Sequence, residues 1–412
     1  MRILMLTPDC QMIDRRILQE AQTLRADGHQ VTLLAGFECH KPEQYEDRGI
    51  PVHRFTYDWD DERLKRIRAR IGAHSGLHRI VNRVFMSVVR RFLKLTPFER
   101  IVAEQGLAHR ADAVHCHDLP VLRSGHWLAQ RWGVPLVFDA HELYHAQETL
   151  PPVLRARLLR DERELLPQCA AVITVNEFIA AELHRIHRVP MPWVIYNSVE
   201  PPPLETIRAR AGCLRERLPD EGPIILFQGW LSGERNIETI VRAMAAVPAP
   251  ARLAVIGYGP HEPELRRAAS EAGVTDRVHF LGRVPSEELL AYTVDADLGV
   301  IPYLPIDLNH RYCSPNKFFE FVLSGVPVLA HDLAFFRTMA ARHGVVAPGD
   351  LSQPASAAAA LRAALVPEVL ERMRERCLEA RGELAWHNDA ARLRQIYSGL
   401  GNGNDAAVRR SD

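Results

Sequence analysis

The sequence predicts an α/β protein built from two Rossmann-like domains. Short apolar runs alternate with helical patterns, beginning with a strand at 2–7, a helix at 14–27 and a strand at 31–35, and this order is typical of parallel sheets. The 412 residues are enough for two domains of about 150–200 residues each. Three consecutive prolines at 201–203 mark the break, because proline fits neither a sheet interior nor a helix centre. We therefore expect domains at 1–198 and 199–384, a helix at 385–400 and a disordered polar tail at 401–412.

The composition is that of a soluble globular protein, and it argues against several other classes of protein. Lys plus Arg and Asp plus Glu both number 51, so no overall charge favours nucleic acid as a partner. Seven scattered cysteines without a C-x-x-C pair fit a reducing compartment better than a disulfide framework. No run of 18 apolar residues occurs, and the first residues are predicted to be a strand rather than a signal peptide. We expect a cytoplasmic location.

A basic segment at 62–100 stands out within the first domain. Eleven Lys or Arg residues face only two Glu residues there, and apolar residues recur between them at helical spacing. Such an amphipathic segment can lie on an anionic membrane surface at the inner face of the membrane. Alternatively, it forms a pair of surface helices whose apolar stripe packs on the domain core.

Polar side chains follow three of the predicted strands of the first domain. The strand at 113–116 leads to His117, and the strand at 136–139 leads to His141 and Glu142. Because parallel strands end at one edge of a sheet, where ligands bind in open α/β folds, we expect these groups to share one site. After the first strand, Asp14 and Arg15 either contact an acceptor or phosphate, or simply begin a helix.

The segment at 314–330, SPNKFFEFVLSGVPVLA, organises the second domain. Ser314 suits a helix N-cap and Pro315 the first helical position. Asn316, Lys317 and Glu320 then share one face of the helix. A helix N-terminus, a lysine and a carboxylate one turn later fit a nucleoside diphosphate, with the amides and lysine on phosphate and the carboxylate on the ribose. The alternative is an ordinary amphipathic helix with a polar outer side.

This segment resembles the nucleotide-sugar signature of the retaining glycosyltransferases of GT-B fold, family 4. The likeness covers nearly the whole chain, is most specific over 228–330, and implies that the helix at 385–400 packs on the first domain. In the family, the match of Glu320 binds ribose, but the glutamate usual eight residues earlier is Tyr312 here. The loop GWLSGER resembles the donor loop, with Trp230 replacing an arginine and Arg235 near the place of the usual lysine.

The residues and the resemblance together assign three sets of roles. The histidine that matches His117 faces the donor sugar in the family, and a guanidinium such as that of Arg235 grips phosphate in a bidentate way. The expected catalytic residues are His117, Arg235 and Lys317; the donor-binding residues are Gly229, Gly257, Gly259, Arg283, Val284, Tyr312, Ser314, Pro315, Asn316 and Glu320; the acceptor-binding residues are Asp14, Arg15, His141 and Glu142.

The resemblance implies transfer of a sugar from a nucleoside diphosphate sugar, with retained anomeric configuration, to a glycan or lipid-linked acceptor. UDP-sugars are the expected donors and GDP-sugars the alternative. We expect no metal or other cofactor: His115, His117, His141 and His145 lack the spacing of a zinc motif, and the D-A-D at 295–297 is expected to be structural. Two other functions remain open, a UDP-sugar 2-epimerase of the same fold and a non-catalytic nucleotide-sugar-binding partner.

Overall fold

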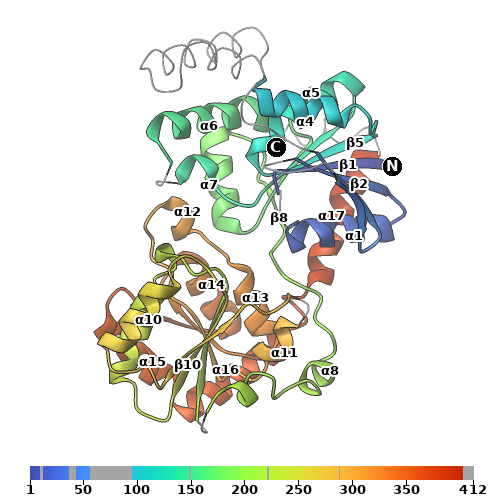
Figure 1. Ribbon diagram of the computed structural model, residues 1–412. Coiled ribbons are helices and arrows are strands. Elements are labelled where there is room, and N and C mark those ends of the chain that lie inside the picture. Colours follow the sequence, from blue (N-terminus) through green and yellow to red (C-terminus); the bar gives the residue numbers. More distant parts are fainter. Residues whose placement is uncertain are drawn as a thin grey trace. The chain divides into compact units, whose positions relative to one another are not determined.

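The computed structural model describes residues 1–9, 13–36, 43–55, 95–147, 150–219, 222–286 and 288–401. The chain divides into two compact units, shown in Figure 1. Unit 1 comprises Met1–His145, Leu150–Ile195 and Ala390–Asp412, and unit 2 comprises Ala146–Thr149 and Tyr196–Asp389. Each has a largely parallel sheet with helices on its faces, so the predicted α/β fold class is confirmed. Residues 62–94 of the basic segment and the tail at 402–412 lie outside the described residues.

The sheet of unit 1 has the order β3-β4-β2-β1-β5-β6-β7-β8. The strands are β1 (Arg2–Thr7), β2 (Gln30–Ala35), β3 (Glu43–Asp47), β4 (Ile50–Arg54), β5 (Ala113–His117), β6 (Leu136–Ala140), β7 (Ala171–Thr174) and β8 (Trp193–Val194). All neighbours are parallel except β3 and β4, whose antiparallel pairing the sequence did not predict. Because the chain leaves the sheet centre in both directions, β1 and β5 flank the switch point at which ligands bind in such folds.

Helices cover both faces of this sheet, as Figure 1 shows, with α4 and α5 on one side and α1 and α17 on the other. The helices of unit 1 are α1 (Arg15–Ala26), α4 (Pro97–Gly106), α5 (Leu119–Trp132), α6 (Pro152–Leu165), α7 (Glu177–His187) and the larger part of α17 (Trp386–Gly401), with most of the short 3-10 turn η1 (Tyr144–Ala146) and the turn η2 (Leu166–Gln168).

Strand alternation decides which side chains of β5 reach which face. Cys116 packs under α5 so closely that a Cβ on Gly125 would lie 2.0 Å from its Sγ, which is why a glycine stands there. His115 and His117 are offset by one position from Cys116 and therefore face the side of α1 and α17. The polar residues of β5 are thus all directed to one face of the sheet.

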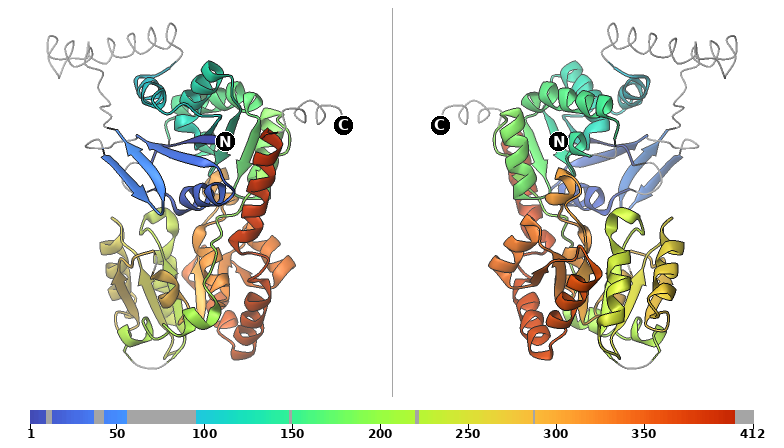
Figure 2. Two further views of the ribbon diagram at one scale, coloured as in Figure 1. Left: turned by 90° about the vertical axis from the view of Figure 1, so that its right-hand side faces the viewer. Right: turned by 90° about the vertical axis from the view of Figure 1, so that its left-hand side faces the viewer.

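Unit 2 has a six-stranded, fully parallel sheet in the order β11-β10-β9-β12-β13-β14. The strands are β9 (Ile224–Gln228), β10 (Arg252–Ile256), β11 (Val278–Gly282), β12 (Leu298–Ile301), β13 (Val328–His331) and β14 (Val346–Gly349). The helices are α8 (Leu204–Arg208), α9 (Ile237–Ala243), α10 (Glu262–Glu271), α11 (Leu289–Thr293), α12 (Leu308–Arg311), α13 (Asn316–Leu323), α14 (Ala334–His343), α15 (Pro354–Ala364) and α16 (Pro367–Ala380), with 3-10 turns η3 (Arg215–Arg217), η4 (Gly233–Arg235) and η5 (Met244–Ala246). In Figure 2 the yellow-green half of this unit holds β9–β11 and the orange half β12–β14.

One sequence-based detail of unit 2 is wrong. The signature helix α13 begins at Asn316, one residue later than expected, and Pro315 rather than Ser314 occupies the N-cap position. The reason is that Pro315 has extended backbone angles (φ −73°, ψ 146°), so the helix can begin only after it. By contrast, Asp295 and Asp297 accept hydrogen bonds from backbone N–H groups, as their structural interpretation requires.

None of the helices in the described ranges combines the length and the apolar character needed to cross a membrane.

Candidate active site

The loops that follow β9 and β10 touch each other through their backbones. Gly229 N–H donates to Ile256 O at 2.9 Å, next to the end of β10. A Cβ on Gly257 would lie 1.8 Å from Gly229 O, and a Cβ on Gly259 would lie 2.2 Å from Leu231 O. Both glycines also have positive φ values, +147° and +159°. Only glycine fits these two positions, because any side chain would push the β9 loop away.

Lys317 joins this loop from the first turn of α13. A Cβ on Gly229 would lie 2.8 Å from Lys317 Nζ, so the lysine reaches the loop directly. Its ammonium donates to the hydroxyl of Tyr303 and lies 4.5 Å from the ring centroid of Phe227. The guanidinium of Arg235 lies 4.6 Å from the ring centroid of Tyr303. The structure therefore brings Lys317 and Arg235 together at Tyr303, and Lys317 also lies beside Gly229.

Glu320 is held in place by a chain of buried side chains. Gln228 Nε2 donates to Glu320 Oε2 at 2.5 Å, and Thr293 Oγ1 donates to Gln228 Oε1 at 3.0 Å. Lys317 and Glu320 are 7% and 6% exposed, which does not match a polar outer helix face in solvent. Sequence reasoning missed Gln228, Thr293 and Tyr303, because no spacing along the chain links them to the signature helix.

The electrostatics of this site favour an anion. Burial lowers the pKa of Lys317 to about 7, the nearby Arg235 acts in the same direction, and Glu320 opposes them. Two cationic groups are thus held close together at a cost that a bound anion would remove. This arrangement can take up the negative charge of a diphosphate without a metal ion.

The other predicted donor residues lie near these loops or along the segment before α13. Gly257 N–H donates to Gly282 O at 2.9 Å, which puts the following Arg283 and Val284 beside the β10 loop. Arg283 is exposed, 5.4 Å from the ring centroid of Tyr258, and Val284 is half-buried. Before α13, Tyr312 is the C-cap residue of α12, Ser314 is buried, and Pro315 and Asn316 are half-buried. Their roles in donor binding stay predictions.

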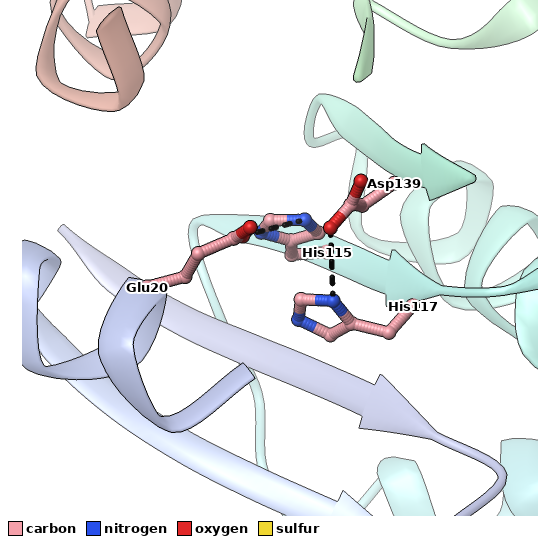
Figure 3. A group of neighbouring side chains, drawn as sticks. All are labelled: Glu20, His115, His117 and Asp139. Atoms are coloured by element: carbon pink, nitrogen blue, oxygen red, sulfur yellow. Dashed lines mark ion pairs between the residues drawn. The ribbon is translucent and has the colours of Figure 1, made fainter. Parts of the chain in front are cut away.

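In unit 1, the ends of β5 and β6 carry a buried polar cluster. His117 and Asp139 are register partners, with His117 Nδ1 3.4 Å from Asp139 Oδ2 (Figure 3). His141 Nε2 lies 3.0 Å from the same oxygen and 3.4 Å from His117 Nδ1. Arg16 holds Asp139 in a bidentate pair, with Nε 2.8 Å from Oδ2 and Nη2 2.9 Å from Oδ1. Two of the predicted histidines therefore meet on one carboxylate that the sequence did not single out.

These contacts set opposite charge states for the two histidines. Burial lowers the pKa of His117 to about 4, so this ring is neutral. Burial acts in the same direction on His141, but Asp118 and Asp139 outweigh it and raise the pKa to about 10. Burial would raise the pKa of Asp139, but Arg16 and the histidines hold it well below its usual range. The cluster thus pairs a neutral imidazole with an imidazolium about one fixed carboxylate.

Glu20 and His115 extend the cluster toward α17. With His117 and Asp139 they place four ligand-type atoms within 4.8 Å of one another (Figure 3). Arg16 already supplies positive charge there, with Nε 3.1 Å from Glu20 Oε1 and 2.8 Å from Asp139 Oδ2. Burial and the charge of Asp139 raise the pKa of Glu20 well above its usual range, which favours a neutral carboxylic acid. This set suits a proton-sharing network better than a divalent cation.

The remaining predicted acceptor residues are Asp14, Arg15 and Glu142, all in unit 1. Asp14 is the N-cap residue of α1 and accepts from Arg16 N–H at 2.8 Å. Arg15 and Glu142 are half-buried. On the other side, Tyr397 of α17 places its hydroxyl 3.0 Å from His115 Nδ1. The acceptor roles of Asp14, Arg15, His141 and Glu142 stay predictions, while Asp14 has a demonstrable structural task.

Two family models match the chain. Residues 13–197 match the glycosyl transferase 4-like domain, and residues 222–365 match the glycosyl transferases group 1 domain. The chain is 29% identical over 238 residues to 2-deoxystreptamine glucosyltransferase of Streptomyces kanamyceticus, covering 54% of this chain. It is 30% identical over 259 residues to D-inositol 3-phosphate glycosyltransferase of Xylanimonas cellulosilytica, covering 56% of this chain. Each alignment spans 59% of the relative's own length.

A solved structure has the same fold as this chain. It is Anabaena Alr3699/HepE in complex with UDP and glucose, with a TM-score of 0.67 at 15% identity, and the match covers 97% of this chain and 100% of that one.

Proposed function

The chain belongs to the glycosyltransferases of GT-B fold, and from this premise we propose that it moves a sugar from a UDP-sugar to a hydroxyl group of a glycan or lipid-linked acceptor, with retained anomeric configuration. The observation that carries the proposal is the convergence of Lys317, Arg235 and the Gly229 backbone at the amino end of α13. Two cations beside the amino end of a helix are what a diphosphate leaving group needs.

The chemistry follows from where charge develops. As the glycosidic bond lengthens, negative charge grows on the diphosphate, and Lys317 and Arg235 stabilise it. Glu320, oriented by Gln228, accepts hydrogen bonds from the ribose hydroxyl groups. In the proposed reaction the acceptor hydroxyl attacks on the face that the phosphate leaves, and the departing phosphate oxygen takes its proton. No protein carboxylate then has to act as nucleophile, in contrast to retaining glycosidases.

UDP is the proposed donor nucleotide. Trp230 and Tyr258 form an edge-to-face pair with ring centroids 5.2 Å apart, and they are 48% and 47% exposed. They lie in the same loops as Gly229 and Gly257 and offer a ring face on which a uracil base can stack. The solved structure of Alr3699/HepE in complex with UDP and glucose supports this choice over GDP.

The proposed acceptor site is the end of β5 and β6 in unit 1. There the imidazolium of His141 can orient hydroxyl groups by hydrogen bonds. The neutral ring of His117, which is proposed to be catalytic and to face the donor sugar, lies 3.4 Å from it. The two relatives are named for 2-deoxystreptamine and D-inositol 3-phosphate, so these two compounds belong in the acceptor screen together with glycans and lipid-linked sugars.

The test is a screen of UDP- and GDP-sugars against these acceptors, in which nucleotide release and the anomeric configuration of the product are measured. We expect UDP release with retention, reduced by about 10²–10³-fold in Arg235→Ala and Lys317→Ala, as for loss of a charge-stabilising donor. Arg266→Ala is the control, because Arg266 is an exposed arginine of α10 paired with Glu262.

Three results would contradict the proposal. An epimerised UDP-sugar formed without acceptor would indicate a 2-epimerase, and nucleotide binding without turnover would indicate a non-catalytic partner. Folded Arg235→Ala and Lys317→Ala variants that turn over as fast as the wild type would remove the assigned roles of both residues.

A further inference from the structure

A second histidine cluster of unit 1 lies where three elements meet. His145 comes from η1, Glu162 from α6 and His187 from the last turn of α7. One ligand-type atom of each residue lies within 4.8 Å of the other two. His145 Nδ1 is 2.6 Å from Glu162 Oε2, and His187 Nε2 is 3.2 Å from the same oxygen. The three side chains are 10%, 4% and 0% exposed, so the cluster is almost closed to solvent.

The ring of His187 indicates that hydrogen bonds within the cluster do not satisfy all of its buried polar atoms. Neither of its ring nitrogens has a hydrogen-bond partner among the residues that the structure describes, although the ring is fully buried. Its Nε2 lies near Glu162 Oε2, but the geometry does not make a hydrogen bond. Buried polar atoms without partners are uncommon, and such an atom that points at a carboxylate and a second imidazole suggests a missing ligand.

We propose that His145, Glu162 and His187 bind a Zn²⁺ ion. Two imidazoles and one carboxylate form a common zinc ligand set, with a water in the fourth position, whereas Mg²⁺ and Ca²⁺ prefer oxygen ligands only. Zinc–ligand bonds of about 2.0–2.2 Å in tetrahedral geometry separate the ligand atoms by about 3.3–3.5 Å. The 3.2 Å from His187 Nε2 to Glu162 Oε2 already fits this separation. The 2.6 Å from His145 Nδ1 to Glu162 Oε2 is shorter, so His145 has to move away by several tenths of an ångström as the ion replaces the proton.

The charges around this cluster differ from those around Glu20. There, Arg16 occupies the cluster with a fixed positive charge. Here, within the described part of the chain, Glu162 forms ion pairs with the two histidines alone. Glu182 adds a second carboxylate nearby: its hydrogen bond to Arg185, followed by the charges of His145 and His187, lowers its pKa. Two carboxylates beside two imidazoles favour a divalent cation.

The site would have a structural task in this enzyme. His145 follows β6 and stands three residues after Glu142, one of the residues predicted to bind the acceptor. An ion held by η1, α6 and α7 ties the segment that carries Glu142 to two helices. This inference does not depend on the donor site or on the transferase reaction.

The test uses the full chain, stripped with a chelator, loaded with Zn²⁺ and then desalted. We expect about one retained zinc per chain by elemental analysis, a higher melting temperature with zinc, and an intense visible absorption of four-coordinate Co²⁺ after cobalt replacement. Glu162→Gln and His145→Gln should lose all three signals. His126→Gln is the control, because His126 lies on α5 and bonds to Gln168 rather than to the cluster.

Zinc retention in His145→Gln and Glu162→Gln equal to that of the wild type would overturn the proposal. So would a wild-type chain that retains no zinc and shows only the weak spectrum of six-coordinate Co²⁺. If Glu162→Gln does not fold, His145→Gln and the wild-type cobalt spectrum still decide, because His145 sits on a short turn rather than in a helix. Transferase activity is not a readout, so failure of the proposed function would leave this result unaffected.

Discussion

Replacing Gly257 by alanine tests how the donor loops are built. The new Cβ would lie 1.8 Å from Gly229 O, whereas ordinary contact begins at 3.4 Å, so the carbonyl group must move by about 1.6 Å. Lys317 Nζ lies 2.8 Å from the place that a Cβ on Gly229 would take, so the shift reaches the proposed phosphate site. A displacement of this size near reacting groups can cost about 10²-fold in rate. The positive φ of +147° adds about 1–3 kcal/mol of backbone strain.

We therefore expect Gly257→Ala to lower kcat/KM for the sugar nucleotide by about 10²-fold or more, with weakened UDP binding by calorimetry. Gly273→Ala is the matched control. Gly273 also has positive φ, +65°, but nothing lies within 4 Å of the place that its new Cβ would take, so the change costs backbone strain of about 1–2 kcal/mol and leaves the loops in place. If Gly257→Ala binds UDP as tightly as Gly273→Ala does, the argument from the touching backbones fails.

Four further predictions concern buried polar groups. Because the pKa of Lys317 is lowered to about 7, the protein should take up a proton when it binds UDP above that pH. The binding heat measured by calorimetry should then depend on the buffer, and this dependence should vanish in Lys317→Met. In the free protein the same shift should make the free energy of unfolding rise with pH between pH 7 and 10.5, because only the unfolded chain keeps this lysine charged in that range. A difference in this free energy between wild type and Lys317→Met that does not change with pH would contradict the prediction. Arg16→Met leaves Asp139 buried without its bidentate partner and should cost about 3–5 kcal/mol in urea unfolding, partly recovered in the double variant with Asp139→Asn. Tyr397→Phe removes the hydroxyl beside His115 and should cost about 1–3 kcal/mol; an unchanged free energy of unfolding would show that this contact is not formed in solution.

Much of the fold was predictable because its signals are local. The alternation of apolar strands and helical patterns located the strands at 2–7, 31–35, 113–116 and 136–139 within one residue of the observed β1, β2, β5 and β6. The sequence did not predict the antiparallel pair β3 and β4, because β3 is polar and largely exposed and β4 has only two buried apolar residues, Ile50 and Val52. The start of α13 was displaced by one residue, since proline tolerates both the N-cap and the first helical position.

The sequence by itself determined the fold class, the family and the segments that end at the ligand-binding edges of the sheets, because strand periodicity and short motifs are contained in short runs of consecutive residues. Only the tertiary structure decided which polar groups meet. Arg16 and Asp139 are 123 residues apart, and Gln228 and Glu320 are 92 apart. Such pairs depend on sheet order, register and the face that each side chain occupies, and none of these can be read from the spacing of residues along the chain. Burial then sets the charge state of each group, so a lysine at pKa about 7 or a histidine at about 4 arises from packing and not from residue type.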